Sequence, residues 1–154
     1  MDAEEAKRLV LGSLPRFPAA GLPALKPDAI KGVKPSSIAR LWAGMGFVYN
    51  LQVQTVDGQD IAIIAKRIEL PKRCDSVGDK RKKDSYDVEA AFYGEGHAER
   101  LISAGCMLPF PLLVEHRKGS GLTLCMSRLN GSRPQPMGEA LDLPWNVAHL
   151  RARR

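Results

Sequence analysis

The spacing of hydrophobic residues changes several times along the chain, and each change predicts a different element. Near the N-terminus, Leu9, Val10 and Leu14 recur at close to helical spacing, which predicts a short helix over residues 3–14. Five prolines then fall within residues 15–35, and this density favours an extended connector without regular structure. The chain is therefore expected to begin with a helix followed by a proline-rich linker.

The middle of the chain carries patterns that are typical of strands and tight turns. A first strand is expected over residues 38–42, and it runs into the glycine-containing turn 44–46. Residues 47–55 alternate between hydrophobic and polar in their second half, as a half-buried strand does. The Asp57-Gly58 pair is a strong hairpin signal, and the almost continuous apolar run 61–68 follows it. Three consecutive antiparallel strands are predicted.

A basic loop and a long helix are expected next. Residues 71–84 are interpreted as the loop, and Asp84 or Ser85 is expected to cap a helix that runs to about residue 104 before Gly105 ends it. Six apolar residues are expected to form the buried stripe of this helix: Val88, Ala91, Phe92, Ala98, Leu101 and Ile102.

Two short strands complete the pattern. Residues 112–115 and 122–126 are largely apolar, and they flank the glycine-containing turn 118–121. The order of three strands, one helix and two strands indicates an α+β fold, in which one helix packs on a five-stranded antiparallel sheet.

The length of 154 residues corresponds to one domain. Within it we expect an N-terminal helix and proline-rich extension over 1–35 and a sheet-bearing lobe over 36–131. The remaining residues, 132–154, are expected to form a C-terminal stub that contains a short helix over 145–152.

Charge and cysteine content narrow the class of protein. The formal net charge is +6, and half of it comes from residues 72–84, where six lysines and arginines accompany three aspartates. This balance favours an anionic partner such as phosphate, nucleic acid or a membrane surface, although charge runs usually form solvated surfaces that serve solubility. There is no run of 18 apolar residues, no signal-like segment and no CxxC pair among the three cysteines. A cytoplasmic protein without a membrane span, a disulfide framework or a zinc site is expected.

Four residues have the types and the order that a phosphate-binding site needs. Gly44 and Gly46 lie in a turn between two strands, where missing side chains let phosphate oxygens approach the backbone N–H groups. Lys66 lies in an apolar strand, so its ammonium group needs a carboxylate partner, and Glu89 on the next helix is the candidate. Each residue also has an ordinary interpretation: the glycines build a hairpin, Lys66 reaches solvent at a sheet edge, and Glu89 is a surface residue. The histidines, His97, His116 and His149, show no spacing that suggests a catalytic triad or a metal site.

These residues resemble the N-terminal lobe of small-molecule kinases with the protein-kinase-like fold. That group includes the aminoglycoside phosphotransferase, choline-kinase-like and ecdysteroid-kinase-like families. The matching segments are Gly44-Met45-Gly46-Phe47, IIAKRI (63–68), VEAAFY (88–93) and LCMSRLNG (124–131), and the resemblance spans about residues 36–131. It implies the ATP-binding lobe of an enzyme that transfers phosphate from ATP to a hydroxyl group.

The resemblance also implies a role for each site residue. Lys66 would bond phosphate oxygens and Glu89 would anchor the lysine, while the backbone at Met126, Ser127 and Leu129 would border the adenine. The implied partners are a nucleotide and an unidentified small-molecule acceptor. Magnesium is implied only together with a second, C-terminal lobe.

The chain departs from this family after residue 131. The catalytic aspartate of an H-x-D type loop and the later metal-binding aspartate are not found, and Asp142 lacks the neighbouring histidine and asparagine of that pattern. We therefore expect a fragment that does not transfer phosphate alone.

Two alternative functions come from other classes of protein. A basic nucleic-acid-binding module is disfavoured because aromatic residues do not interleave with the basic ones. A regulatory lobe would dock on a partner, or on a second copy, through an exposed apolar face.

Overall fold

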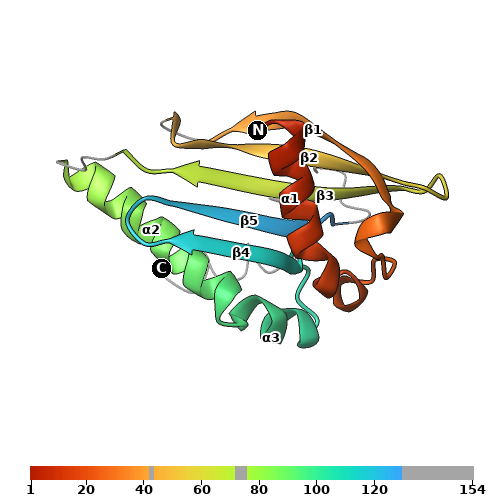
Figure 1. The fold of residues 1–154 in the computed structure, drawn as a ribbon. Helices are drawn as coiled ribbons and strands as arrows, with labels where there is room; N and C mark the ends of the chain where they lie inside the picture. Colours follow the sequence, from red (N-terminus) through yellow and green to blue (C-terminus); the bar gives the residue numbers. More distant parts are fainter. Residues whose placement is uncertain (42–43, 72–75, 130–154) are drawn as a thin grey trace, which may run out of the picture.

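The computed structural model describes residues 1–41, 44–71 and 76–129, which form an α+β fold around a five-stranded antiparallel sheet. The strands lie side by side in the order β1-β2-β3-β5-β4, so that β1 and β4 are the edges (Figure 1). Their bounds are β1 (Ile30–Arg40), β2 (Gly46–Thr55), β3 (Asp60–Glu69), β4 (Pro111–Arg117) and β5 (Gly121–Ser127). The predicted fold class is confirmed.

Helices lie on both faces of the sheet. In the view of Figure 1, α1 (Ala3–Ser13) crosses in front of the strands, and α2 (Val77–Gly94) runs behind β4 and β5. The short helix α3 (His97–Ser103) follows α2 directly. Short 3-10 helices connect α1 to β1: Leu14–Arg16, Pro18–Ala20 and Pro27–Ala29.

The alternation of side chains along the strands gives the sheet two apolar faces. In β3, Ile63 and Ala65 face α1, whereas Ile64 and Ile68 face α2. The face covered by α1 holds the larger core, because that helix buries four residues, while α2 fully buries only Ala90. The helix on the second face therefore buries fewer side chains against the sheet, and this is the face that carries the candidate site.

The proline-rich segment differs from its prediction. The proline-rich connector is present but ends at Ala29 rather than at residue 35, because β1 begins at Ile30 and continues through Pro35. The expected start of the first strand near residue 38 is wrong. Pro35 lies opposite Leu51 in the register of β1 and β2. A proline is tolerated there because β1 is an edge strand, where the missing N–H group can face away from the sheet. The boundary expected between residues 35 and 36 falls inside this strand.

The helix after β3 begins earlier and ends earlier than predicted. Ser76 caps α2 by accepting a hydrogen bond from the Asp79 backbone N–H at 3.0 Å, so the basic residues 80–83 are helical rather than part of a loop. Lysine and arginine are good helix formers, but their run of charge was interpreted as a solvated loop, so the start of α2 was predicted too late. The chain turns at Gly96, whose φ of 77° requires glycine, and the expected single helix to residue 104 is thereby divided into α2 and α3.

The buried stripe predicted for this helix is wrong at two of its six positions, while Ala91, Phe92 and Ile102 are half-buried. Val88 is 68% exposed and Leu101 is 41% exposed, although Ala98 is buried as expected. α2 instead faces the sheet with Tyr86, Ala90 and Tyr93. A periodic sequence cannot specify which face of a helix meets the sheet when apolar residues lie on more than one side.

The remaining predictions concern four strands, which are confirmed, and the C-terminal stub, which is not tested. The strands over 47–55, 61–68, 112–115 and 122–126 are confirmed to within a few residues, as are the turns that join them in pairs. The expected stub over 132–154, with its short helix, lies outside the described residues.

Candidate functional site

Lys66 lies on the α2 side of β3, the central strand of the sheet. Its cross-strand partners are Val48 in β2 and Leu124 in β5, so the aliphatic stem of the lysine lies among apolar residues. Its neighbour Arg67 points to the opposite face, where the guanidinium group bonds Glu5 of α1. The ammonium group of Lys66 therefore needs a polar partner from α2.

Glu89 on α2 supplies that partner. Lys66 Nζ donates hydrogen bonds to both carboxylate oxygens, at 2.6 Å to Oε1 and 2.8 Å to Oε2. The predicted contact is present, and the interpretations of Lys66 as an edge residue and of Glu89 as an unpaired surface residue are wrong. The two side chains are 20% and 25% exposed, so the pair is accessible from solvent. An ammonium group has three N–H donors, and one remains for another acceptor.

Two tyrosines of α2 flank Glu89. Tyr86 precedes it by one turn, and the centroid of its ring lies 5.7 Å from Lys66 Nζ, within the range at which a cation is attracted to an aromatic face. Tyr93 follows by one turn and packs against the core on this side of the sheet. Burial, and next the negative charge of Glu89, raise the pKa of both phenols above the ordinary value. Sequence analysis missed Tyr86, although its i−3 spacing from Glu89 is a usable signal.

Both predicted glycines occupy backbone positions that disfavour a side chain. Gly44 has a φ of 69°, in the left-handed region. A Cβ atom at Gly46 would lie 2.0 Å from the backbone carbonyl oxygen of Arg67, which is closer than atoms can approach. The interpretation of these residues as a hairpin is correct for the backbone, since the turn connects β1 to β2. The tight packing of Gly46 against β3 goes beyond what a hairpin needs.

The glycine turn is attached to the end of β3 that lies beyond Lys66. Gly46 is the cross-strand partner of Ile68, and the Glu69 N–H donates to the Met45 carbonyl oxygen at 2.8 Å. The turn and Lys66 therefore belong to the same end of the sheet, two residues apart along β3. The described contacts do not join either glycine to the lysine directly.

The three residues predicted at the exit of β5 have different surroundings. Met126 is buried in the same apolar cluster as Leu124 and Ala90, on the Lys66 side of the sheet. Ser127 is fastened to Phe110, because its N–H donates to the Phe110 carbonyl oxygen and its Oγ accepts from the Phe110 N–H, both at 2.9 Å. Leu129 is 40% exposed. The backbone N–H of Ser127 is therefore already hydrogen-bonded within the fold. Of these three residues, Leu129 is the one that solvent reaches.

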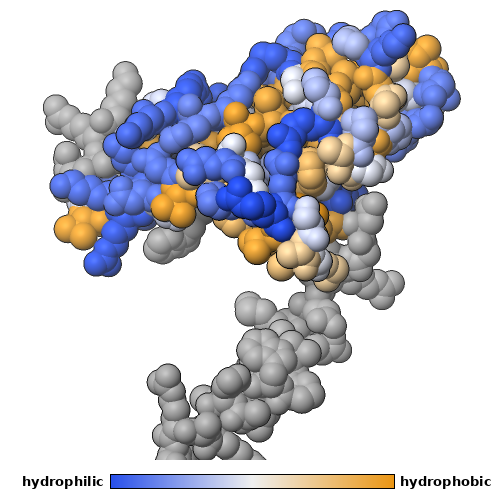
Figure 2. All heavy atoms as spheres, turned by 90° about the horizontal axis from the view of Figure 1, so that it is seen from below, coloured by the Kyte–Doolittle hydropathy of each residue, from blue (hydrophilic) through white to orange (hydrophobic). Residues whose placement is uncertain are grey.

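Basic residues lie on the first turns of α2 and in the turn between β4 and β5, and Lys83 connects the two segments. Lys80 and Arg81 are exposed on the first turns of α2, and Lys118 is exposed in the turn. Lys83 Nζ reaches this turn, 3.5 Å from where a Cβ atom on Gly119 would lie. Hydrophilic residues predominate at this end of the molecule, the left end in the views of Figures 1 and 2. We call Lys80, Arg81, Lys83 and Lys118 the basic cluster.

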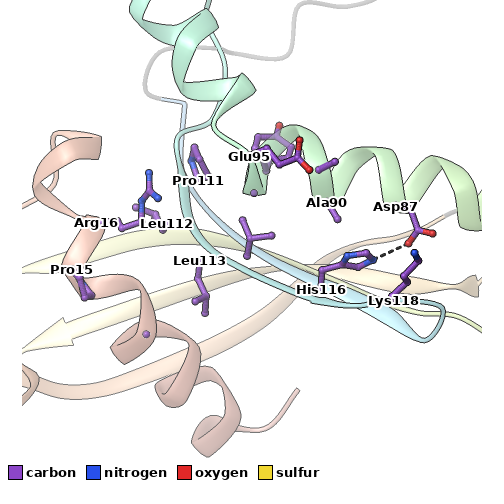
Figure 3. Close-up of a pocket in the computed structure, with 15 residues that line it drawn as sticks. Pro15, Arg16, Asp87, Ala90, Glu95, Pro111, Leu112, Leu113, His116 and Lys118 are labelled. Atoms are coloured by element: carbon purple, nitrogen blue, oxygen red, sulfur yellow. Dashed lines mark hydrogen bonds and ion pairs between the residues drawn. The ribbon is translucent and has the colours of Figure 1, made fainter.

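A groove of about 1040 Å³ opens between α2 and the edge strand β4 (Figure 3). Three of the α2 residues that line it are small, and they leave room beside β4: Ala90, Ala91 and Gly94. At one end of the groove, His116 of β4 and Asp87 of α2 point toward one another, with 2.8 Å between Nε2 and Oδ1. Neither the groove nor this pair had a signal in the sequence, where the spacing of His116 suggested neither a catalytic triad nor a metal site.

Comparisons with known proteins add no assignment. No protein-family model matches the chain, and neither a curated protein nor a solved structure matches it.

Across residues 1–41, 44–71 and 76–129, no group of three or more His, Cys, Asp or Glu side chains is placed to hold a metal ion. A helix both long enough and apolar enough to cross a membrane is absent from that same part of the chain.

Proposed function

We propose that this chain binds a nucleoside triphosphate, as the ATP-binding lobe of a phosphotransferase that acts on a small molecule. The observation that carries the proposal is the two-oxygen contact between Lys66 on the central strand and Glu89 on α2. A partly exposed ion pair contributes little net stability, so stability alone does not explain a lysine among apolar neighbours. A lysine held rigidly by a carboxylate, with one N–H donor remaining, suits the oxygens of a phosphate.

The other predicted residues support the proposal by their placement. Gly44 is exposed in the turn at the end of the sheet that carries Lys66, so phosphate oxygens can approach the main chain there, whereas Gly46 is buried against β3. Met126 and Leu129 lie at the exit of β5, where the base of the nucleotide would be bordered. In this proposal Lys66 binds nonbridging phosphate oxygens and Glu89 orients the lysine, while magnesium remains implied only together with a second lobe.

The test is equilibrium binding of ATP, with and without magnesium, followed by NMR on the isotopically labelled chain. We expect the signals of Lys66 and Glu89 to shift together with those of the glycine turn and the β5 exit. Saturable shifts confined to the basic cluster would contradict the proposed site, because the triphosphate would then be held only by surface charge. A complete absence of shifts at millimolar nucleotide would contradict it too.

A second candidate function, nucleic-acid binding, is favoured by the basic cluster. Its four cations come from α2 and from the β4–β5 turn, and such a patch attracts a phosphate backbone without reading its sequence. We expect any binding of this kind to weaken steeply as salt is raised. Replacing Lys80 and Arg81 with glutamine would abolish it and leave ATP binding at Lys66 unchanged. Loss of both activities together would point to a single shared site.

Exposed apolar side chains support a protein partner as well. Met107 is 87% exposed, and Leu101 and Leu129 are each about two-fifths exposed. Large apolar side chains in water favour association with another surface. We expect the isolated chain to self-associate as its concentration rises, and analytical ultracentrifugation of Met107→Ser against the unaltered chain measures whether Met107 contributes.

A further inference from the structure

α2 is attached to the sheet by few apolar contacts. It has 18 residues, yet Ala90 is its one fully buried side chain, whereas the 11 residues of α1 bury four. The side chains explain part of the difference, because Ala91 and Gly94 line the groove beside β4 and have little apolar surface to bury. Since apolar burial is the main force that docks a helix on a sheet, polar links have an unusually large share in positioning α2.

Among the contacts of the described residues, two pairs of charged or polar side chains connect α2 to the sheet, and they reach different strands. Glu89 contacts Lys66 on β3, and Asp87, two residues earlier, contacts His116 on β4. The His116 and Asp87 side chains are 31% and 29% exposed, so water only partly screens their interaction. Because both carboxylates lie on the same turn of one helix, a change in the link at Asp87 moves Glu89 relative to Lys66.

The charges around His116 are few. Asp87 faces it from α2, and Lys118, in the turn that follows β4, lines the same groove. Lys83 reaches the adjoining turn. The cross-strand partner, Leu122, is apolar, and Glu115 points to the other face, where it bonds Arg8.

The other charged residues of the groove, Arg16 and Glu95, lie toward its opposite end in Figure 3. Each has a partner of its own, Glu99 for Arg16 and His97 for Glu95. Asp87 is therefore the nearest carboxylate available to a protonated His116.

We propose that His116 is a positioning residue for the pair of Lys66 and Glu89, and that it makes nucleotide affinity depend on pH. The inference rests on the proposed function. An imidazole gains its positive charge as the pH falls from about 8 to about 5. The link to Asp87 then changes from a hydrogen bond between a neutral ring and a carboxylate to an ion pair, and α2 is held more firmly. Affinity for ATP rises as the pH falls, by about two- to fivefold for a partly exposed pair.

The first measurement uses the nucleotide-free chain. The ¹³C signal of the Glu89 side-chain carboxyl is followed from about pH 8 to about pH 5, together with the ring signals of His116. We expect the Glu89 signal to follow the titration of His116, and we expect this component to vanish in His116→Gln, which retains an N–H donor without a titrating charge. A Glu89 signal that behaves identically in both chains overturns the inference. His97→Gln is the matched control, because it removes another histidine paired with a carboxylate, and it is expected to retain the effect.

The second measurement is the ATP dissociation constant at both ends of this pH range. The ratio between His116→Gln and the unaltered chain cancels the titration of the phosphate itself. We expect this ratio to rise about two- to fivefold toward low pH, and Asp87→Asn to match His116→Gln. A ratio that stays constant overturns the inference while leaving ATP binding in place. If ATP does not bind at all, the proposed function fails, and the Glu89 signal still decides whether His116 positions that carboxylate.

Discussion

Replacing Lys66 with methionine removes the ammonium group and keeps an unbranched side chain that fills the same space. The stem of Lys66 lies between Val48 and Leu124, and methionine adapts well to such apolar surroundings. Glu89 loses its partner but remains 25% exposed, so water can solvate the carboxylate. We therefore expect the free energy of unfolding to fall by about 1 kcal/mol or less.

The expected effect of Lys66→Met on nucleotide binding is much larger. The structure leaves one N–H donor of Lys66 for a phosphate oxygen, and a hydrogen bond to a charged group contributes about 1.5–3 kcal/mol. Losing it corresponds to ATP binding that is about 10- to 150-fold weaker. Adenosine has no phosphate, so its affinity for the chain is expected to stay unchanged.

The assay is isothermal titration calorimetry with ATP and with adenosine, alongside urea denaturation of each variant. Lys34→Met is the matched control, because Lys34 is an exposed lysine on the edge strand β1 and is expected to leave both affinities intact. Glu89→Gln tests the anchor, since a lysine without its carboxylate loses its fixed position. The double variant of Lys66 and Glu89 should weaken binding by less than the sum of the single effects.

Two results would refute this reasoning. One is ATP binding by Lys66→Met that equals binding by the unaltered chain. The other is a proportional loss of ATP and adenosine binding, because Lys66 would then act through the fold rather than on a phosphate.

Three further predictions concern stability and reactivity. Gly46→Ala places a Cβ atom 2.0 Å from a backbone carbonyl oxygen of β3, so we expect unfolding free energy to fall by about 1–3 kcal/mol in urea denaturation, whereas Gly32→Ala meets open space and should be nearly neutral. The hydrogen bond from Arg8 lowers the pKa of Glu115, so the pair stabilises the fold above the unfolded-state pKa and loses this contribution as the pH falls through the folded-state pKa. Arg8→Met should therefore cost up to about 1 kcal/mol near pH 7 and nothing in strong acid, as urea midpoints at both pH values will show. Burial raises the pKa of the Cys125 thiol to about 11, and mass spectrometry after iodoacetamide treatment should find this residue labelled only once the chain unfolds.

Local patterns in the sequence were sufficient for most of the sheet. The alternation and apolar runs of 47–55 and 61–68, with Asp57-Gly58 between them, predicted β2, β3 and their hairpin because these depend on neighbouring residues. The same reasoning failed for β1, since proline density argued against regular structure. Pro35 fits there only because β1 is at the edge of the sheet, and edge position is a property of the assembled sheet.

The start of α2 shows a second limit. The basic residues 80–83 are compatible with a helix or with a solvated loop, and the Ser76 cap decides between them. The orientation of the helix was equally undetermined, because Val88 suggested one buried face and Tyr86 and Tyr93 occupy another.

By itself, the sequence determined the residue types of the candidate site and the elements that carry them. Lys66 in an apolar strand needs a carboxylate, and Glu89 is the one that the family resemblance implied. Only the tertiary structure decided that both carboxylate oxygens contact Lys66 and that Tyr86 lies beside the ammonium group. It alone decided that Asp87 meets His116 at the end of a groove. Periodicity is set by the backbone within a few residues, whereas contacts across 23 or 29 positions depend on how a helix packs on a sheet.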